Sequence, residues 1–218
     1  MNLGYSILAA VLLLGVLVLF SIVVLTLFFV SYAVVHSLLA GLSVKNWARR
    51  MFGPATDRWY RLFYNIFATI TLLPLFLLLA ILPDQTLYVV PTPWRWLLVG
   101  GQLLALLGMG LAAIQTNLFH FIGLSQLLSE NPTEHGSFTV DGFYNWVRHP
   151  IYFFSLLFIW LTPLMTINLS VTYLLFTIYF YSGSIYEERR LVAEFGPAYQ
   201  EYQRRVPRLI PIPGRRYQ

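Results

Sequence analysis

The segment YNWVRHPIY, residues 144–152, places two side chains that can bind an anion directly before a long apolar run. Pro150 suits the first turn of a helix, because proline lacks the N–H group that would be unpaired there. Arg148 and His149 would then lie at a helix N-terminus, where unpaired backbone N–H groups and the helix dipole favour negative charge. This arrangement predicts a site for a carboxylate or a phosphate. The alternative is an interfacial arginine beside a capping histidine, which is common where a span ends.

Two adjacent carboxylates, Glu187 and Glu188, follow the same apolar run. Carboxylates at a membrane interface are costly unless they have partners. Arg189 and Arg190 could be those partners, or one glutamate could face inward and meet Arg148 or a cationic ligand.

Aromatic residues crowd this region, and an aromatic belt at the membrane surface accounts for most of them. They are Phe143, Tyr144, Trp146, Tyr152, Tyr179, Tyr181 and Tyr186. Aromatic faces beside carboxylates also suit a sulfonium or an ammonium group. A ligand with an anionic end, a cationic centre and a flat heterocycle fits all these features, and S-adenosylmethionine is such a ligand.

The composition shows what kind of chain must position these residues. Of the 218 residues, 58% are hydrophobic and only 11% are charged, whereas soluble domains carry about 25% charged residues. The sequence therefore predicts an integral membrane protein of the all-α class. The absence of cysteine excludes disulfides, thiolate metal sites and a cysteine nucleophile, and the four histidines lack a metal-ligand spacing. The net charge of +5 lies in loops beside the spans, which favours lipid headgroups over nucleic acid as the counter-charge.

Apolar runs of about 18 or more residues mark the predicted spans. The first three spans are predicted at 5–40, 60–82 and 94–114, followed by a polar connector at 115–150 and a last apolar run at 151–186. Pro163 and Asn168 interrupt the last run, so it forms either a hairpin of two spans or one kinked helix.

Charge asymmetry favours the hairpin. If residues 163–170 form its turn, all fourteen Lys and Arg residues except Arg95 lie on one side of the membrane. The positive-inside rule makes that side cytoplasmic and places the N-terminus outside. We therefore expect five transmembrane helices, with the connector and the tail, residues 187–218, in the cytoplasm.

The second half of the chain resembles the isoprenylcysteine carboxyl methyltransferase superfamily over about residues 115–212. The superfamily signature contains an Arg-His-Pro segment, a Glu-Glu pair and a Phe-Gly segment followed by tyrosines and Val-Pro. The matching residues are Gly142, Tyr144, Arg148, His149, Pro150, Tyr152, Glu187, Glu188, Phe195, Gly196, Tyr199, Tyr202, Val206 and Pro207. The segment NLFH, which ends at His120, also resembles the start of the family's connector.

The resemblance implies an integral-membrane methyltransferase that uses S-adenosylmethionine and needs no metal. It divides the chain into a three-helix region, 1–114, and a region that carries the signature, 115–218. Arg148 and Glu188 would act at the methyl-transfer end. The residues expected at the cofactor are His120, Gly142, Phe143, Tyr144, His149, Pro150, Tyr152 and Glu187.

The first half resembles bacterial members, among them the small-thiol methyltransferase and denitrification-associated branches. We therefore expect a small or lipophilic methyl acceptor, which is a thiol, a carboxylate or a lipid, and a bacterial inner membrane. His135 is one residue too early for the family's histidine and is doubtful as a cofactor contact. His36 is expected to be structural, and Lys45, Arg49 and Arg50 are expected at lipid headgroups. Arg61 and Asn65, four residues apart on one helix face, are candidates to reach the site from the second span.

Two other functions compete with the methyltransferase. One is an NADPH-dependent membrane reductase of the sterol-reductase type, for which the connector offers only Arg148 to bind the 2′-phosphate. The other is a non-catalytic assembly or binding protein. The intact Arg-His and Glu-Glu pairs argue against the latter, and the oligomeric state is left open.

Overall fold

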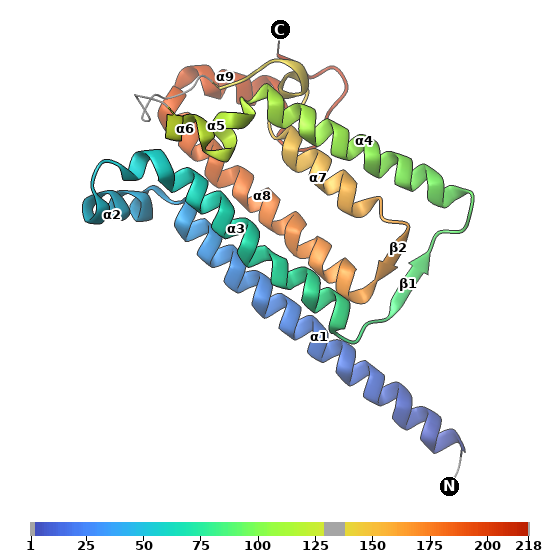
Figure 1. Cartoon of the computed structure of the whole chain (residues 1–218). Coiled ribbons are helices and arrows are strands. Elements are labelled where there is room, and N and C mark those ends of the chain that lie inside the picture. Colours follow the sequence, from blue (N-terminus) through green and yellow to red (C-terminus); the bar gives the residue numbers. More distant parts are fainter. Residues whose placement is uncertain (1–2, 129–137, 218) are drawn as a thin grey trace.

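The computed structural model describes residues 3–128 and 138–217, which are mostly helical (Figure 1). In chain order the helices are α1 (Leu3–Ala40), α2 (Leu42–Phe52), α3 (Thr56–Ile81), α4 (Trp94–Gln115), α5 (Leu118–Ile122), α6 (Leu124–Leu128), the 3₁₀ helix η1 (Gly142–Asn145), α7 (Pro150–Trp160), α8 (Ile167–Phe195) and α9 (Pro197–Arg205). The short strands are β1 (Thr86–Val89) and β2 (Leu164–Thr166). The all-α class is confirmed.

The first three predicted spans are confirmed as helices. The segments Gly4–Ala40, Thr56–Ile81 and Trp94–Gln115 are each long and apolar enough to cross a membrane. Their outward side chains are apolar and exposed, as expected where lipid rather than water is the neighbour. The chain is therefore an integral membrane protein.

The last apolar run reverses direction where Pro163 and Asn168 predicted a break. Helix α7 ends at Trp160, β2 follows, and α8 begins at Ile167 and runs back beside α7 (Figure 1). Eleven residues make α7 about 16 Å long, which is about half the thickness of a bilayer core. The hairpin is thus present, while the count of five spans stays a prediction.

Helices α4 and α7 pack closely because glycines lie between them. A Cβ atom added to Gly108 would lie 2.5 Å from the ring of Phe154, and one added to Gly101 would lie 2.9 Å from Leu161. Small residues allow helix backbones to approach within a membrane. The glycine-rich third span therefore positions α7, whose first residues belong to the predicted site.

The antiparallel ribbon formed by β1 and β2 was not predicted from the sequence, and it joins the two loops at the end of the molecule far from α9 (Figure 1). Thr86 pairs with Thr166 and Val89 with Leu164. Asp84 fixes this end, because its Oδ1 accepts from the backbone N–H groups of Gln85 (2.8 Å) and of the α8 residue Asn168 (3.0 Å).

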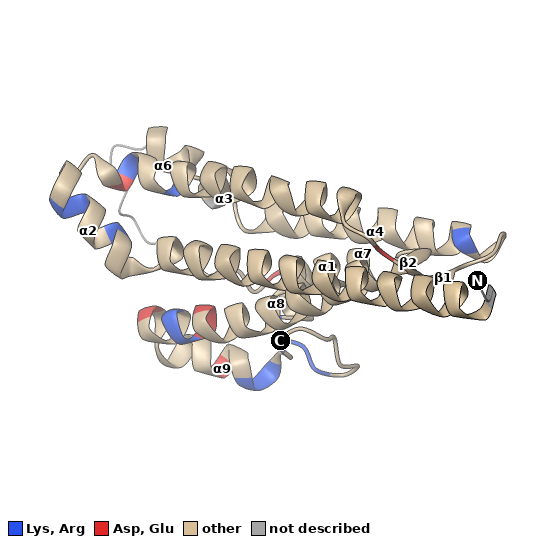
Figure 2. Cartoon of the chain, turned by 90° about the horizontal axis from the view of Figure 1, so that it is seen from below, with Lys and Arg blue, Asp and Glu red and all other residues tan. Residues whose placement is uncertain are grey.

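Charged side chains gather at the opposite end, around α2, α9 and the end of α8 (Figure 2). Asp57, at the start of α3, is buried and forms ion pairs with Lys45 and Arg49 of α2, both at 3.2 Å. These two cations, expected at lipid headgroups, thus also hold α2 against α3, and both are more than one-third exposed. The structure leaves Arg50 exposed.

We predict that Asp84→Ala destabilises the ribbon end, because two backbone N–H groups lose their acceptor. Each buried unpaired donor costs about 1–3 kcal/mol, so the midpoint of thermal unfolding in detergent should fall. Asp84→Asn keeps a side-chain oxygen and is the matched control, expected near the wild type. Equal midpoints for all three proteins would contradict this account.

Candidate functional site

The predicted site begins where the chain leaves the connector and enters α7. Pro150 is the first residue of α7, as the sequence predicted, and His149 occupies the N-cap position. The backbone N–H groups of Arg148 and His149 donate to the carbonyls of Pro207 (2.9 Å) and Arg208 (3.1 Å). The segment after α9 thus pairs with the segment before α7 and fixes the orientation of both side chains.

The centre of the site is a network around the carboxylate of Glu188, which has 2% of its surface exposed. Oε1 accepts from Nε of Arg148 at 2.7 Å and from Nε2 of His149 at 3.1 Å. Oε2 accepts from Nε2 of Gln203 at 2.9 Å and from Nη2 of Arg208 at 3.0 Å. A carboxylate has about four acceptor positions, so the Glu188 network uses its full capacity.

Arg148 is equally engaged, with 8% of its side chain exposed. Besides Glu188, its Nη1 donates to the backbone carbonyls of Gln203 (2.8 Å) and Val206 at the end of α9. The predicted catalytic pair, Arg148 and Glu188, is therefore in direct contact. The other hydrogen-bond partners of the pair, apart from His149, come from the tail.

Charge complementarity sets the ionisation of this network. Burial acts to raise the pKa of Glu188, but hydrogen bonds from His149, Arg148 and Arg208 outweigh it and lower that pKa to about 2. Burial acts to lower the pKa of His149, but hydrogen bonds to Glu187 and Glu188 outweigh it and raise that pKa. These directions agree with the geometry, in which each ring nitrogen of His149 faces a carboxylate, Nε2 that of Glu188 and Nδ1 that of Glu187.

Glu187 lies on another face of α8 and is far less engaged. Its Oε2 accepts from the hydroxyl of Tyr152 at 3.1 Å and lies 3.5 Å from Nδ1 of His149. In the described part of the chain, Oε1 of Glu187 accepts no hydrogen bond, and 38% of the side chain is exposed. The rings of His149, Tyr152 and Phe180 stack beside it at centroid separations of 5.3 and 5.2 Å.

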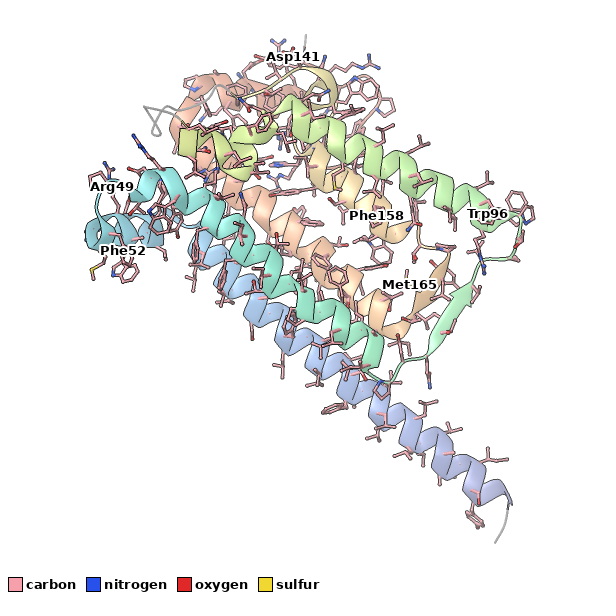
Figure 3. The ribbon with its side chains drawn as sticks, viewed as in Figure 1. Arg49, Phe52, Trp96, Asp141, Phe158 and Met165 are labelled. Carbon is pink, nitrogen blue, oxygen red and sulfur yellow. The ribbon has the colours of Figure 1, made fainter. Side chains whose placement is uncertain are left out.

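The tail is held in place by a hydrophobic cluster, whose buried members are Tyr199, Tyr202 and Val206. Phe138 packs against both tyrosines, with centroids 5.3 and 5.7 Å away. The hydroxyl of Tyr202 donates to the backbone carbonyl of Tyr144 at 2.5 Å. These signature residues therefore support the site through packing. Figure 3 shows Asp141, the residue before η1, at the same end of the molecule as α9.

The remaining residues predicted at the cofactor lie along the connector. Gly142 has φ +60°, and a Cβ atom there would lie 2.3 Å from the side chain of Gln115. Gln115 also accepts from the backbone N–H of Phe143 at 3.1 Å, and the Phe143 ring packs on Phe154 at 4.9 Å. Only glycine fits position 142, so η1 lies directly against the end of α4.

His120 lies apart from the Glu188 network and contacts α3. Nη1 of Arg61 approaches Nδ1 of His120 at 2.9 Å and donates to the His120 carbonyl at 3.1 Å. Asn65, one turn further along α3, donates to the carbonyl of Ile122 at 3.0 Å. Arg61 and Asn65 thus do extend from the second span to the connector. His135 lies outside the described residues.

His36 belongs to a separate polar cluster between α1, α3 and α8. Its Nε2 lies 2.6 Å from the hydroxyl of Tyr64, and its ring packs against Tyr32 and Tyr179. Polar contacts of this kind join helices within a membrane, which agrees with the structural role expected for His36. Among the described residues, no group of His, Asp and Glu is arranged to hold a metal ion.

Residues 42–206, which contain all of these contacts except those of His36, Pro207 and Arg208, match the family described as a protein of unknown function (DUF1295). The match covers well over half of the chain. The chain belongs to the DUF1295 family.

Characterised relatives connect this DUF1295 protein with methyl transfer. It is 33% identical over 190 residues to methanethiol S-methyltransferase 2 of Bradyrhizobium diazoefficiens, covering 83% of this chain and 69% of the relative. It is 31% identical over 205 residues to methanethiol S-methyltransferase of Crocosphaera subtropica, covering 85% and 72%. The protein of the same name from Mycobacterium tuberculosis is 32% identical over 198 residues, covering 84% and 75%. No solved structure matches the chain significantly. The relatives confirm the predicted kinship with membrane methyltransferases.

The site of this DUF1295 protein also contains residues that the sequence reasoning missed. Gln203 and Arg208 complete the Glu188 network, and Gln115 supports η1. Gln203 lies one turn from Tyr199 and Val206 on the buried face of α9, so helical spacing from the signature tyrosines could have indicated it. Nothing in the sequence singles out Gln115, because its contact depends on the approach of α4 to η1.

We predict that the adjacent glutamates differ sharply in their effect on stability. Glu188→Gln leaves Arg148 and Arg208 without their counter-charge, and breaking a buried pair costs about 3–5 kcal/mol. Glu187→Gln removes a half-exposed charge and should change the free energy of unfolding little. Denaturant titration of both variants in detergent measures the difference. Similar losses for the two variants would contradict the assignment of Glu188 as the buried anchor.

We also predict a specific loss of stability in acid. The pKa of Glu188 falls from an ordinary value of 4.5 to about 2 in the folded protein. The stabilisation is therefore present above about pH 4.5 and is lost as pH falls toward 2, because the unfolded state then takes up the proton first. Unfolding midpoints measured from pH 6 to pH 2 should fall more steeply for the wild type than for Glu188→Gln. Parallel curves would show that Glu188 does not contribute.

Proposed function

We propose that this protein is an S-adenosylmethionine-dependent methyltransferase of the membrane, acting on a small thiol. The observation that carries the proposal is Glu187, an ionisable carboxylate with an unused acceptor oxygen beside the stacked rings of His149, Tyr152 and Phe180. A carboxylate and aromatic faces together attract a cation. The relatives that are named methanethiol S-methyltransferases support the same function.

The residues present fit the cofactor. S-adenosylmethionine supplies a methyl group bound to a positively charged sulfur. Glu187 and Tyr152 would bind its cationic part, and Gly142, Phe143 and Tyr144 would shape the connector side of the site. His149 and Pro150 would form the wall at the start of α7, and His120 would contribute from the far side of the connector. Arg148 and Glu188, which contact each other and the tail, would set the positions of these groups.

The names of the relatives support a small thiol as the methyl acceptor, and the charges of the site agree with that proposal. A thiol reacts as its thiolate, and a nearby cation lowers the pKa of a thiol. Protonated His149 is such a cation, held in place by Glu188 at 3.1 Å. The surrounding helices are apolar, and a water-poor site favours a reaction in which a sulfonium and a thiolate both lose their charge.

We further propose that the connector and tail face the cytoplasm of a bacterial inner membrane, with the N-terminus outside. The gathering of Lys and Arg around α2, α9 and the end of α8 supports this orientation (Figure 2). The names of the relatives favour the methyltransferase over an NADPH-dependent reductase or a non-catalytic protein.

The proposal predicts that detergent-purified protein binds S-adenosylmethionine and converts methanethiol to dimethyl sulfide. Glu187→Gln should weaken cofactor binding by at least about tenfold, since it removes a counter-charge worth about 1.4 kcal/mol or more. Calorimetry measures the binding, and gas chromatography measures the product. Glu201→Gln is the control, because Glu201 is a partly exposed glutamate of α9 that pairs with Arg204 and Arg205. Folded protein that binds no S-adenosylmethionine would disprove the proposal.

A further inference from the structure

Arg61 is a cation on the second predicted span, outside the methyltransferase signature. It lies in the first turns of α3 and is half-buried. Its Nη1 contacts the ring nitrogen Nδ1 and the backbone carbonyl of His120. Because a guanidinium can only donate, Nδ1 must accept, so the imidazole is neutral. Burial first, and the charge of Arg61 second, lower the pKa of His120, which agrees with this state.

His120 therefore fixes the guanidinium and leaves part of its capacity unused. A guanidinium has five N–H donors, and the two contacts with His120 involve Nη1 alone. Across residues 3–128 and 138–217, Nε and Nη2 of Arg61 form no hydrogen bond or ion pair. A half-buried cation with unused donors is expected to have an anionic partner.

The support beneath Arg61 is rigid. The connector crosses α3 so closely at Gly123, where φ is +95°, that a Cβ atom would lie 2.5 Å from the backbone nitrogen of Leu62. Asn65 binds the carbonyl of Ile122, and Gln126 donates to the carbonyl of His120 at 3.3 Å. The guanidinium is thus held by a docked segment of chain rather than by a mobile loop.

A negative charge with unused capacity lies on α8, in the side chain of Glu187. Tyr64, one turn after Arg61 on α3, lies 2.6 Å from Nε2 of His36, and the His36 ring packs against Tyr179, two turns before Glu187 on α8. This cluster joins the two helices, yet within the described chain Arg61 and Glu187 form no ion pair with each other. Oε1 of Glu187 is the acceptor left without a partner in the described chain. One fixed cation and one fixed anion, each incompletely paired and carried by helices that the His36 cluster joins, match the carboxylate and ammonium groups of an amino acid.

We infer that Arg61 and Glu187 together bind the amino-acid end of the cofactor, Arg61 its carboxylate and Glu187 its ammonium group. The inference rests on the proposed function and extends it. It makes α3, from the region 1–114, part of the cofactor site, and it gives His120 the role of positioning Arg61. The rings of Tyr152 and His149 beside Glu187 would then face the sulfonium.

Three ligands distinguish the contact of Arg61 with the carboxylate from the contact of Glu187 with the ammonium group. S-adenosylmethionine carries the carboxylate and the ammonium group, its decarboxylated form carries only the ammonium group, and 5′-methylthioadenosine carries neither. Binding of each is measured by calorimetry on the full-length protein in detergent. Arg61→Gln should weaken the binding of S-adenosylmethionine at least tenfold and leave the binding of the other two ligands unchanged. Glu187→Gln should weaken the binding of S-adenosylmethionine and of its decarboxylated form, and leave the binding of 5′-methylthioadenosine unchanged.

Arg58→Gln is the matched control, because Arg58 lies one turn earlier on α3, is exposed and loses the same charge. It should bind all three ligands as the wild type does. Unchanged binding of S-adenosylmethionine by Arg61→Gln would overturn the inference, and so would equal weakening of all three ligands, which would show that Arg61 only supports the fold. Wild-type protein that binds none of the ligands would instead overturn the proposed function itself.

Discussion

The buried carboxylate of Glu188 is the constraint on which the rest of the site depends. It receives Arg148 and His149 from the start of α7, and Gln203 and Arg208 from the tail. The buried side chains of Arg148 and His149 are balanced by this one carboxylate, which the partly exposed Arg208 also faces. The network therefore joins α7, α8 and α9 at one point. Together with the backbone hydrogen bonds from Arg148 and His149 and the cluster around Tyr199 and Tyr202, it fixes the tail against the membrane helices.

This anchoring gives the two adjacent glutamates different roles. Residue type alone could not have assigned these roles, because the two side chains are chemically identical. Glu188 faces α9 and is saturated, whereas Glu187, about 100° further round the helix, faces the stacked rings and keeps an unused oxygen. His149 contacts both carboxylates through its two ring nitrogens. The histidine thus couples the structural side of α8 to the side proposed to bind the cofactor, and a change in one carboxylate alters the charge felt by the other.

The connector is positioned from both of its ends. At one end, Gly142 allows η1 to lie against Gln115 of α4, and at the other, Gly123 allows α5 and α6 to lie against α3. Both glycines have positive φ, and at both a side chain would collide with the neighbouring helix. The first half of the chain therefore acts as more than a membrane anchor, because α3 and α4 fix the backbone that carries His120, Phe143 and Tyr144.

The sequence by itself determined the membrane class, the first three long helices, the break after α7 and the central residues of the candidate site, which are Arg148, His149, Glu187 and Glu188. These follow from local properties, namely runs of apolar residues, proline at a helix start and the spacing of the signature. Only the tertiary structure decided that Glu188 is saturated while Glu187 is not, that Gln203 and Arg208 complete the network, and that the two loops pair as a ribbon. Each of these depends on contacts between segments far apart in the chain. A linear pattern does not encode such contacts, because they arise from the direction in which each helix face points after packing.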